Sequence, residues 1–504
     1  MRFPRSSGIL LHPTSLPGRL GIGELGAEAR GFIDFLAASG QTLWQVLPLG
    51  PTGYGESPYQ CLSAWAGNPL LISLEGMVEK GWMDGGVLAG VPKFSEDRVD
   101  FEQVIPWKMA LLESATPDAE GFVPFCEANR HWLDDFALFT ALKAEHGGVE
   151  WTKWEAGARD RDPAALTGWS GKLAGKIAAQ KFLQFVFFEQ WRELRAYAQA
   201  RGVRILGDLP IYVAHDSADV WVNRRFFELD ARGNPTVVSG VPPDYFSKTG
   251  QLWGNPIYRW DALAADGYRW WLDRFRGAFQ MVDMIRLDHF RGFEAYWEVP
   301  AAEKTAVNGR WVKGPGSALF RAAEQSLGAL PLVAENLGVI TPEVEAIRAE
   351  FKFPGMAILQ FAFGTDPQSP TFRPHNYPRE VVAYTGTHDN DTTVGWWKSQ
   401  AATDSTRSEE DIRRERDFAK RYLHSDGSEI HWTFIRALEA SVANTVLIPL
   451  QDVLGLGTDA RMNRPATASG NWRWRYREGA LKLEMAERLR EMAELYDRGA
   501  FPRV

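Results

Sequence analysis

A cation and a carboxylate stand two residues apart in the apolar run formed by residues 284–288. Side chains two apart on a β-strand point to the same face, so Arg286 is predicted to lie beside Asp288. In that position it keeps the carboxylate ionised and fixes the direction of its oxygens. An oriented, ionised carboxylate at a strand end can act as a covalent nucleophile. Taken alone, the pair could equally be an ordinary ion pair at the end of a strand.

Two later apolar runs also lead to a carboxylate. Residues 332–334 precede Glu335, and residues 381–387 lead to His388 and Asp389. Three such acids in chain order favour a single pocket surrounded by carboxylates, as glycoside chemistry requires. In retaining transfer, one carboxylate attacks the sugar and a second serves as acid and base, about 5–5.5 Å away.

The neighbouring residues suggest a role for each carboxylate. Arg286 keeps Asp288 charged, which suits the nucleophile. Glu335 follows an apolar strand without an adjacent cation, which suits an acid whose proton must persist near neutral pH. Asp389, next to His388, is expected to hold sugar hydroxyls and to favour the distorted, oxocarbenium-like ring.

Eight apolar runs are candidates for the strands that position these groups. They are residues 8–13, 42–48, 203–210, 284–288, 332–335, 356–361, 381–384 and 446–449. Helical periodicity follows most of them, which indicates parallel strands joined by right-handed crossovers. The pattern predicts an α/β fold, a (β/α)8 TIM barrel, rather than an open sheet. Catalytic groups of such barrels lie at the carboxyl ends of strands, so Asp288 and Glu335 are expected to face each other across a substrate.

The alternation of strands and helices lapses in two places. Residues from approximately 69 to 170 show apolar helical periodicity and are predicted to form a helical insertion. Residues 211–268 are rich in Pro, Gly and aromatic side chains and are predicted to be an irregular insertion. We therefore expect a single catalytic barrel over residues 1–504 with two large insertions.

Composition and charge exclude several classes of protein. The net charge is −8 and no basic run is present, which argues against a nucleic-acid surface. Cys61 and Cys126 are the two cysteines, too few for a disulfide framework and without metal-ligand spacing. No stretch approaches 18 apolar residues, so no membrane span is expected. The first residues lack a signal-peptide core, and we expect a cytoplasmic protein.

Motifs for metals and nucleotide cofactors are also missing, so we expect neither. The histidines at positions 12, 289 and 388 form no HExxH pattern, and no Gly-rich phosphate loop follows a strand. Asp208, after the third predicted strand, could simply cap a loop. Several aromatic residues lie in loops rather than on periodic faces, which makes them candidate sugar platforms: Tyr54, Tyr59, Tyr245, Phe246 and Trp253.

Ordered motifs along most of the chain resemble those of amylomaltases, the 4-α-glucanotransferases or disproportionating enzymes of the α-amylase clan. They comprise residues 11–18, 44–49, 57–59, 207–211, 242–246, 286–290, 334–335, 387–392, 460–463 and 470–472. The resemblance implies Asp288 as nucleophile, Glu335 as acid/base and Asp389 as transition-state stabiliser, in agreement with the roles argued above. It also implies no cofactor and no separate C-terminal β-domain.

The resemblance further implies a set of substrate contacts. Arg286, Asp208 and His388 would contact the sugar at the scissile bond, with Tyr59 stacked on it. The loop around Tyr245 would cover the acceptor side. The complete implied set is Ser57, Tyr59, Asp208, Asp244, Tyr245, Phe246, Gln251, Trp253, Arg286, His388 and Asn463. Two positions depart from the usual motif: Asn336 stands where relatives usually carry Asp, and Ala466 where Gly is common.

We predict a transferase that cleaves α-1,4-glucans such as maltooligosaccharides and amylose. The donor is held on Asp288 and passed to the 4-hydroxyl of another glucan or of glucose, with cyclisation as a possible outcome. One alternative is an α-1,4-glucan hydrolase of the same clan. Another is a non-catalytic glycan-binding or scaffold protein, against which the three carboxylates argue. The oligomeric state stays open, with a monomer preferred, and so does a remote glucan site near Tyr54.

Overall fold

Eight parallel strands form the centre of the protein in the computed structural model, which describes residues 3–115, 119–243, 248–401, 408–465, 467 and 469–499. Their hydrogen-bonded order is β10-β11-β12-β1-β2-β3-β6-β9. All eight predicted strands are confirmed, although the first lies two to three residues earlier than expected. The strands are β1 (Ser6–Leu10), β2 (Leu43–Gln45), β3 (Arg204–Pro210), β6 (Met284–Asp288), β9 (Leu332–Ala334), β10 (Gly355–Ile358), β11 (Val381–Tyr384) and β12 (Thr445–Pro449).

The two ends of this sheet, β9 and β10, lie next to each other. The Ala334 N–H donates to the Pro354 carbonyl at 2.9 Å, and the Met356 N–H donates to Asn336 Oδ1 at 2.8 Å. These contacts join the sheet edges, so the strands form a nearly closed barrel. The predicted (β/α)8 fold class is thereby confirmed.

Alternation along the strands separates the barrel interior from the layer under the helices. In β6, Met284 joins an interior cluster with Leu10, Leu206 and Val382 from other strands. Ile285 belongs to the larger core between strands and helices. Because the side-chain period of a strand is two, Met284 and Arg286 share the inward face. The arginine therefore stands above the apolar interior, at the carboxyl end of the barrel.

Helices cover the outside of the barrel, and their buried faces follow the 3.6-residue period. In α11, for example, Trp271, Arg274 and Phe275 are buried. Residues 359–380, between β10 and β11, form only short 3-10 turns, so this unit lacks its barrel helix. Helices of the described ranges include none long and apolar enough to cross a membrane. The helices around the barrel are α1 (Ala27–Ala38), α8 (Ala174–Gln199), α10 (Trp260–Ala265), α11 (Arg269–Met281), α12 (Ser317–Leu327), α13 (Pro342–Glu350), α14 (Thr393–Lys398), α15 (Glu409–Leu423), α16 (Ile430–Glu439), α17 (Leu450–Val453) and α18 (Leu483–Leu495).

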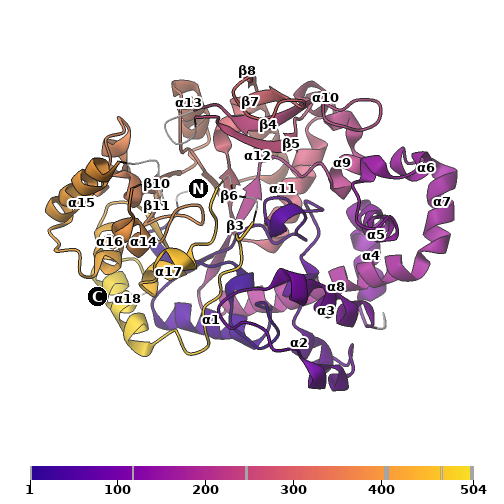
Figure 1. Ribbon diagram of the computed structural model, residues 1–504, viewed down its shortest axis with the longest axis horizontal. Helices are drawn as coiled ribbons and strands as arrows, with labels where there is room; N and C mark the ends of the chain where they lie inside the picture. Colours follow the sequence, from indigo (N-terminus) through magenta and orange to yellow (C-terminus); the bar gives the residue numbers. More distant parts are fainter. Residues whose placement is uncertain are drawn as a thin grey trace.

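A group of helices extends from one side of the barrel between β2 and β3. Helices α4 to α7 form the right-hand edge of Figure 1, and the long helix α8 leads back toward β3. Gly202 adopts a positive φ of 73° just beyond α8, which ends the helix before β3 begins. The helices that precede α8 are α2 (Leu74–Glu79), α3 (Phe101–Glu113), α4 (Phe122–Ala128), α5 (Arg130–Glu145), α6 (Ala156–Arg159) and α7 (Pro163–Lys172).

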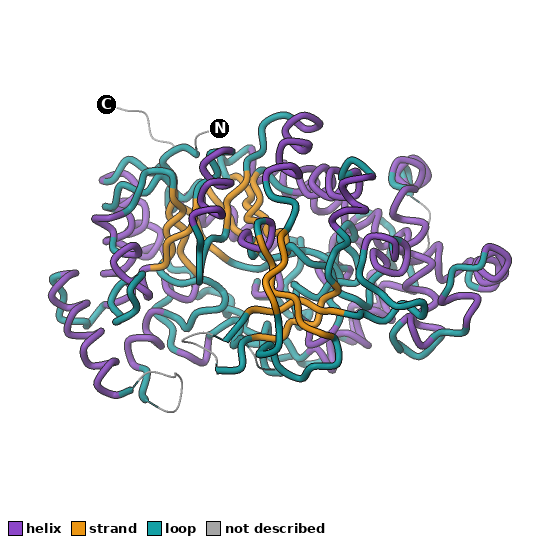
Figure 2. Tube along the Cα trace, turned by 90° about the horizontal axis from the view of Figure 1, so that it is seen from above, coloured by secondary structure: helices purple, strands orange, loops and turns teal. Residues whose placement is uncertain are grey.

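A second, antiparallel sheet has the order β5-β4-β7-β8, and Figure 2 shows the strands in two groups. Its strands are β4 (Val237–Val241), β5 (Gln251–Pro256), β7 (Ala295–Pro300) and β8 (Arg310–Lys313). Residues 211–268, which we expected to be irregular, thus contain two strands and two short helices, α9 (Ala218–Val222) and α10. The expectation missed the sheet because β4, besides pairing with the nearby β5, pairs with β7, which lies beyond β6 in the chain, and such long-range pairing leaves no local pattern.

Candidate active site

Arg286 lies between two carboxylates at the carboxyl end of the barrel. Its Nη1 is 2.6 Å from Asp208 Oδ2, and its Nη2 is 3.0 Å from Asp288 Oδ1. The register of β3 and β6 explains the arrangement, because Asp208 pairs with Arg286 and the two-residue spacing brings Asp288 to the same face. Arg286 is only 5% exposed, so both interactions act with little screening by solvent. The geometry holds the Asp288 carboxylate in one orientation, as the spacing in the sequence predicts.

Tyr59 completes this cluster from the loop after β2. Its hydroxyl donates to Asp208 Oδ2 at 3.0 Å, and its ring stacks on His388 with centroids 5.1 Å apart. Burial raises the pKa of Asp208, an effect that the nearby Arg286 opposes. Ser57 supports the loop, since the Tyr59 N–H donates to Ser57 Oγ at 3.2 Å. The contacts fix an aromatic ring beside the carboxylates, where a pyranose face could pack.

Glu335 follows β9 directly and is held by two backbone donors. The His289 N–H donates to Glu335 Oε2 at 2.8 Å, and the Leu337 N–H donates to Oε1 at 3.0 Å. Burial raises the pKa of Glu335 to about 7, against the opposing influence of Arg286. The sequence predicted an acid without a neighbouring cation. The structure brings Arg286 near enough to act, and burial outweighs it.

His289 turns the chain away from β6 with a positive φ of 52°, which directs its N–H to Glu335. Its ring meets the Trp253 ring edge to face, with centroids 4.7 Å apart. Trp253 Nε1 donates to Gln251 Oε1 at 3.2 Å, so both predicted residues of β5 lie beside the β6 turn. Burial lowers the pKa of His289 to about 4, and its imidazole is therefore neutral near pH 7.

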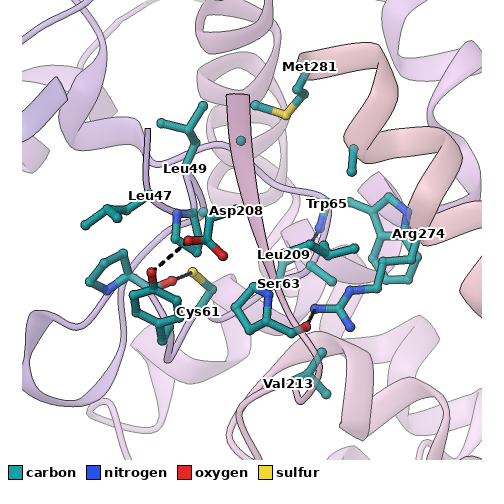
Figure 3. A pocket seen from close by; sticks show the side chains of 18 of the residues that line it. Leu47, Leu49, Cys61, Ser63, Trp65, Asp208, Leu209, Val213, Arg274 and Met281 are labelled. Atoms are coloured by element: carbon teal, nitrogen blue, oxygen red, sulfur yellow. Dashed lines mark hydrogen bonds between the residues drawn. The ribbon is translucent and has the colours of Figure 1, made fainter. Parts of the chain in front are cut away.

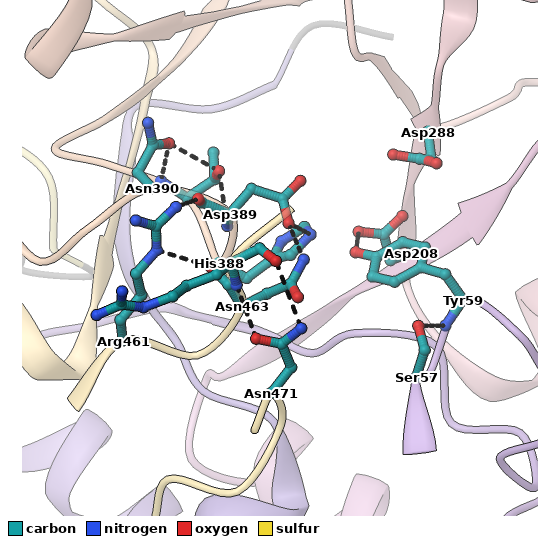
Figure 4. Close-up of polar contacts among 12 residues, drawn as sticks. Ser57, Tyr59, Asp208, Asp288, His388, Asp389, Asn390, Arg461, Asn463 and Asn471 are labelled. Carbon is teal, nitrogen blue, oxygen red and sulfur yellow. Dashed lines mark hydrogen bonds and ion pairs between the residues drawn. The ribbon is translucent and has the colours of Figure 1, made fainter. Parts of the chain in front are cut away.

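Asp389 lies on the loop after β11, on the opposite side of the site in Figure 4. Asn463 Nδ2 donates to its Oδ1 at 2.6 Å, and His388 Nε2 is 3.4 Å from the same oxygen. The backbone carbonyl of Asp389 accepts a hydrogen bond from Arg461 Nη2 at 2.6 Å. The Asp389 side chain is 47% exposed, so one of its oxygens is available to a bound sugar.

The loop of Asp389 is held at both ends by a buried residue that the sequence did not single out. Asp452, fully buried in α17, accepts hydrogen bonds from Thr385 Oγ1 at 2.5 Å, from Thr393 N at 2.6 Å and from Thr393 Oγ1 at 2.8 Å. These partners stand at the two ends of the loop. Arg461 was likewise missed as an individual residue, although it belongs to the motif at 460–463. A buried acid in a helix gives no local signal, because its partners lie about 60 residues away.

Asn336 is a third residue whose role becomes visible only in the structure. Its Oδ1 accepts from the Met356 N–H at 2.8 Å and its Nδ2 donates to Glu345 Oε1 at 2.9 Å. An amide can make both contacts, whereas an aspartate in its place could not donate to Glu345. Asn336 therefore joins β9 to β10 directly behind Glu335.

Tyr59 and Asp208 also line a small cavity of about 90 Å³. Figure 3 shows Asp208 in its wall. Cys61 and Arg274 contribute to its wall, and Cys61 Sγ donates to the Pro58 carbonyl at 2.9 Å. Burial raises the pKa of the Cys61 thiol to about 12, which makes it unreactive as a nucleophile at neutral pH. We therefore assign the cavity no catalytic role; its wall includes the loop that carries Tyr59.

Three predicted substrate contacts, Asp244, Tyr245 and Phe246, lie outside the described residues, as does Ala466. The other predicted residues gather in two groups around the carboxyl end of the barrel. One group surrounds Arg286, and the other surrounds Asp389. Tyr54 is 79% exposed on the surface of its loop.

Comparison with known proteins shows to which family the chain belongs. The family described as 4-alpha-glucanotransferase matches residues 11–482. The chain is 51% identical to the 4-alpha-glucanotransferase of Synechocystis sp. over 98% of both chains, and 49% identical to that of Thermus thermophilus over 99% of this chain and 100% of the relative. The amylomaltase from Streptococcus agalactiae in complex with acarbose shares the fold with a TM-score of 0.91 at 37% identity, covering 98% of this chain and 100% of that one. The chain belongs to the 4-alpha-glucanotransferase family and is an enzyme with that activity.

Proposed function

We propose that the enzyme transfers α-1,4-glucan segments by retaining double displacement, with Asp288 as nucleophile and Glu335 as acid/base. In the first step an Asp288 oxygen attacks the anomeric carbon while Glu335 gives its proton to the glycosidic oxygen. The released glucan leaves with a free 4-hydroxyl. In the second step the 4-hydroxyl of an acceptor gives its proton to Glu335 and attacks the anomeric carbon, and Asp288 departs as a carboxylate.

The observation that carries this assignment is the contrast between the two carboxylates. Asp288 has a guanidinium nitrogen of Arg286 at 3.0 Å, whereas the pKa of Glu335 is raised to about 7 by burial. One group is thus paired with a cation and the other keeps a proton near neutral pH, as the nucleophile and the acid of this reaction require. Asp389 is proposed to stabilise the oxocarbenium-like transition state through the sugar hydroxyls.

Linear α-1,4-glucans are the proposed substrates. Tyr59, His388 and Trp472 form a cluster of rings with centroids 5.1–6.0 Å apart, next to Asp389. Such rings pack against the apolar faces of pyranoses. The acarbose bound to the Streptococcus agalactiae relative supports the same substrate class. Cyclisation, a cytoplasmic location and a monomeric state are further proposals that rest on the sequence.

The predicted covering loop would favour transfer over hydrolysis. From the resemblance of the sequence, we propose that Tyr245 and Phe246 cover the acceptor side and shield the intermediate from water. An oriented acceptor hydroxyl can have an effective molarity of about 10⁵ M or more, enough to outcompete water. Incubation with maltotriose should therefore give a ladder of longer maltooligosaccharides plus glucose, with little gain in reducing ends. Reducing ends that rise in step with maltotriose consumption would indicate hydrolysis instead.

The roles of the carboxylates can be separated with an activated donor. With α-glucosyl fluoride, Glu335→Gln should still form the covalent intermediate, because fluoride needs little protonation to leave. Asp288→Asn should form none and should lose about 10⁴-fold or more of the transfer rate. Mass spectrometry of the intact protein detects the trapped glucosyl group. A covalent adduct in Asp288→Asn, or none in Glu335→Gln, would contradict the assignment.

A further inference from the structure

A second, larger cavity lies outside the active site, between the helical insertion and the barrel. It has a volume of about 330 Å³, within the range of cavities that hold small ligands. Helices α5, α9 and α11 supply its walls, together with the loop that contains Ser63 and Trp65. None of the three proposed catalytic carboxylates contributes to it.

Indole rings form much of the cavity wall. Trp65, Trp132 and Trp270 all line it, and the rings of Trp65 and Trp270 meet edge to face with centroids 5.6 Å apart. The Nε1–H groups of Trp65 and Trp270 are buried and find no hydrogen-bond acceptor within the described part of the chain. An unpaired buried donor is costly, so water or a ligand is expected to supply the acceptors. The wall thus combines apolar ring surface with two available donors.

Asp219 provides a buried acceptor in the same cavity. It is 3% exposed, and its Oδ2 accepts a hydrogen bond from the Ala64 N–H at 2.8 Å. Within the described ranges no Lys, Arg or His lies within ion-pair distance of it, and burial raises its pKa to about 6 against the opposing influence of the Ala64 hydrogen bond and of Arg274. The lining charges of Arg225 and Arg269 lie near Asp266 instead. An anionic ligand would therefore meet a carboxylate that no ion pair neutralises, and a simple cation would leave the indole donors unpaired.

We propose that this cavity binds a short neutral saccharide of one or two pyranose rings, at a site separate from the active site. A pyranose offers apolar C–H faces to the indole rings, hydroxyl oxygens to the indole N–H donors and hydroxyl protons to the Asp219 carboxylate. Since this enzyme acts on α-glucans, the end of a glucan chain such as a maltosyl unit is the ligand of that class to test. The assignment does not depend on the roles of Asp288 and Glu335.

Trp270 is the suitable reporter of occupancy. It is 6% exposed and lines this cavity, whereas Trp65 lies on the loop that also carries Tyr59 and could respond to the active site. Trp472, whose ring centroid is 5.9 Å from that of Tyr59, reports on the active site. Resonances of both can be followed by ¹⁹F NMR in the full chain labelled with 5-fluorotryptophan, and assigned with the single variants Trp270→Phe and Trp472→Phe.

The experiment titrates maltose into the labelled Asp288→Asn protein, in which turnover is expected to be abolished. Both the Trp270 and the Trp472 resonances should shift saturably. The added substitution Val222→Phe fills the cavity from α9. It should lower the maltose affinity measured from the Trp270 resonance about tenfold or more and leave the affinity measured from the Trp472 resonance unchanged. The matched control is Val442→Phe at a valine that is 51% exposed and does not line the cavity, and it should change neither response.

The proposal is overturned if maltose moves the Trp472 resonance but not that of Trp270. It is equally overturned if the Trp270 shift survives in the blocked variant. Should Val222→Phe fail to fold, as judged by its thermal melt, Arg225→Phe replaces it. The Arg225 side chain lines the cavity but is 72% exposed, so this substitution narrows the mouth without disturbing the core, and the same loss is expected. In wild-type background both blocked variants should retain transfer from maltotriose, which separates this site from the active site.

Discussion

The two sides of the active site are built by different means. On one side, Asp208 and Asp288 come from neighbouring strands, and the strand register places both against the buried Arg286. On the other side, Asp389 lies on a half-exposed loop, and its position depends on hydrogen bonds from Asn463 and Arg461. Figure 4 shows the two groups facing each other. The strand side is fixed by the fold, whereas the loop side is fixed by individual contacts.

This difference in burial indicates which interactions should cost the most catalytic activity when they are lost. On the strand side Arg286 and Asp208 are almost fully buried, whereas the Asp288 side chain is 29% exposed. Loss of a partner therefore leaves an uncompensated charge in a medium of low polarity, above all at Asp208. Contacts of the loop side are partly solvated, and water can replace some of them. Substitutions of matched chemistry on the two sides should therefore differ widely in effect.

The largest difference is expected between the two arginines. Arg286→Met leaves Asp208 and Asp288 facing each other without a cation, and should lower kcat/KM for maltotriose by about 10³-fold or more. Arg461→Met removes the hydrogen bonds to the carbonyls of Asp389 and Asn463, and should lower it by about 10- to 100-fold. Steady-state kinetics, with thermal melts to verify folding, measure both. Equal losses would show that burial does not distinguish the two sides.

The same contrast explains what the sequence could predict. Asp288 and Glu335 were placed correctly at strand ends, because a short apolar run indicates a buried strand and each carboxylate stands at the end of such a run. The contact between Arg286 and Asp288 follows from the two-residue period of a strand. By contrast, the contact of Arg286 with Asp208 requires the pairing of β3 with β6, which are 78 residues apart at this contact. No local pattern carries that information.

Fewer contacts of the loop side could be predicted from the sequence. His388 and Asp389 could be found from their motif, but the anchoring by Asp452 could not, because a helical aspartate normally suggests a solvated position. The antiparallel sheet was missed for the same reason, as its strands β4 and β7 belong to different crossovers. Tertiary pairing, rather than propensity, decides these elements.

A smaller effect is expected from the anchor of the Asp389 loop. Asp452→Ala leaves Thr385 Oγ1, Thr393 Oγ1 and the Thr393 N–H without their buried acceptor, so the loop loosens. We expect about a tenfold loss in kcat with a smaller change in KM, together with a lowered melting temperature. The exposed Asp417, changed to Ala as a control, should alter neither. A melting temperature that falls while kcat is retained would limit Asp452 to a structural role.

The pH profile of the unsubstituted enzyme tests the strand side, with Glu335→Gln as its control. Because the pKa of Glu335 is raised to about 7, the protonated acid needed for the first step is lost as the pH rises through this value. For maltotriose, kcat/KM should therefore fall above pH 7, by about tenfold per pH unit. With α-glucosyl fluoride, Glu335→Gln should show no such limb. A wild-type profile that stays flat to pH 9 would remove Glu335 from the role of acid.

The smallest effect is expected from Asn336, which joins the strand side to β10. Asn336→Asp adds a negative charge next to Glu335 and disfavours its ionised form, which raises the pKa of Glu335 further. The alkaline limb of the kcat/KM profile should then move to higher pH, by less than about one unit. The new carboxylate also faces Glu345 in place of an amide donor, so the melting temperature should fall.

Asn444 offers a matched control for this substitution. Its Nδ2 donates to Glu380 Oε1 at 3.1 Å, the same chemistry as the contact between Asn336 and Glu345, but it directly precedes β12, at the opposite end of the barrel. Asn444→Asp should therefore lower the melting temperature in the same way and leave the pH profile unchanged. A limb that moves in both variants would mean that any added charge shifts the profile. A limb that moves only in Asn336→Asp shows that the residue behind Glu335 helps to set the pKa of the acid.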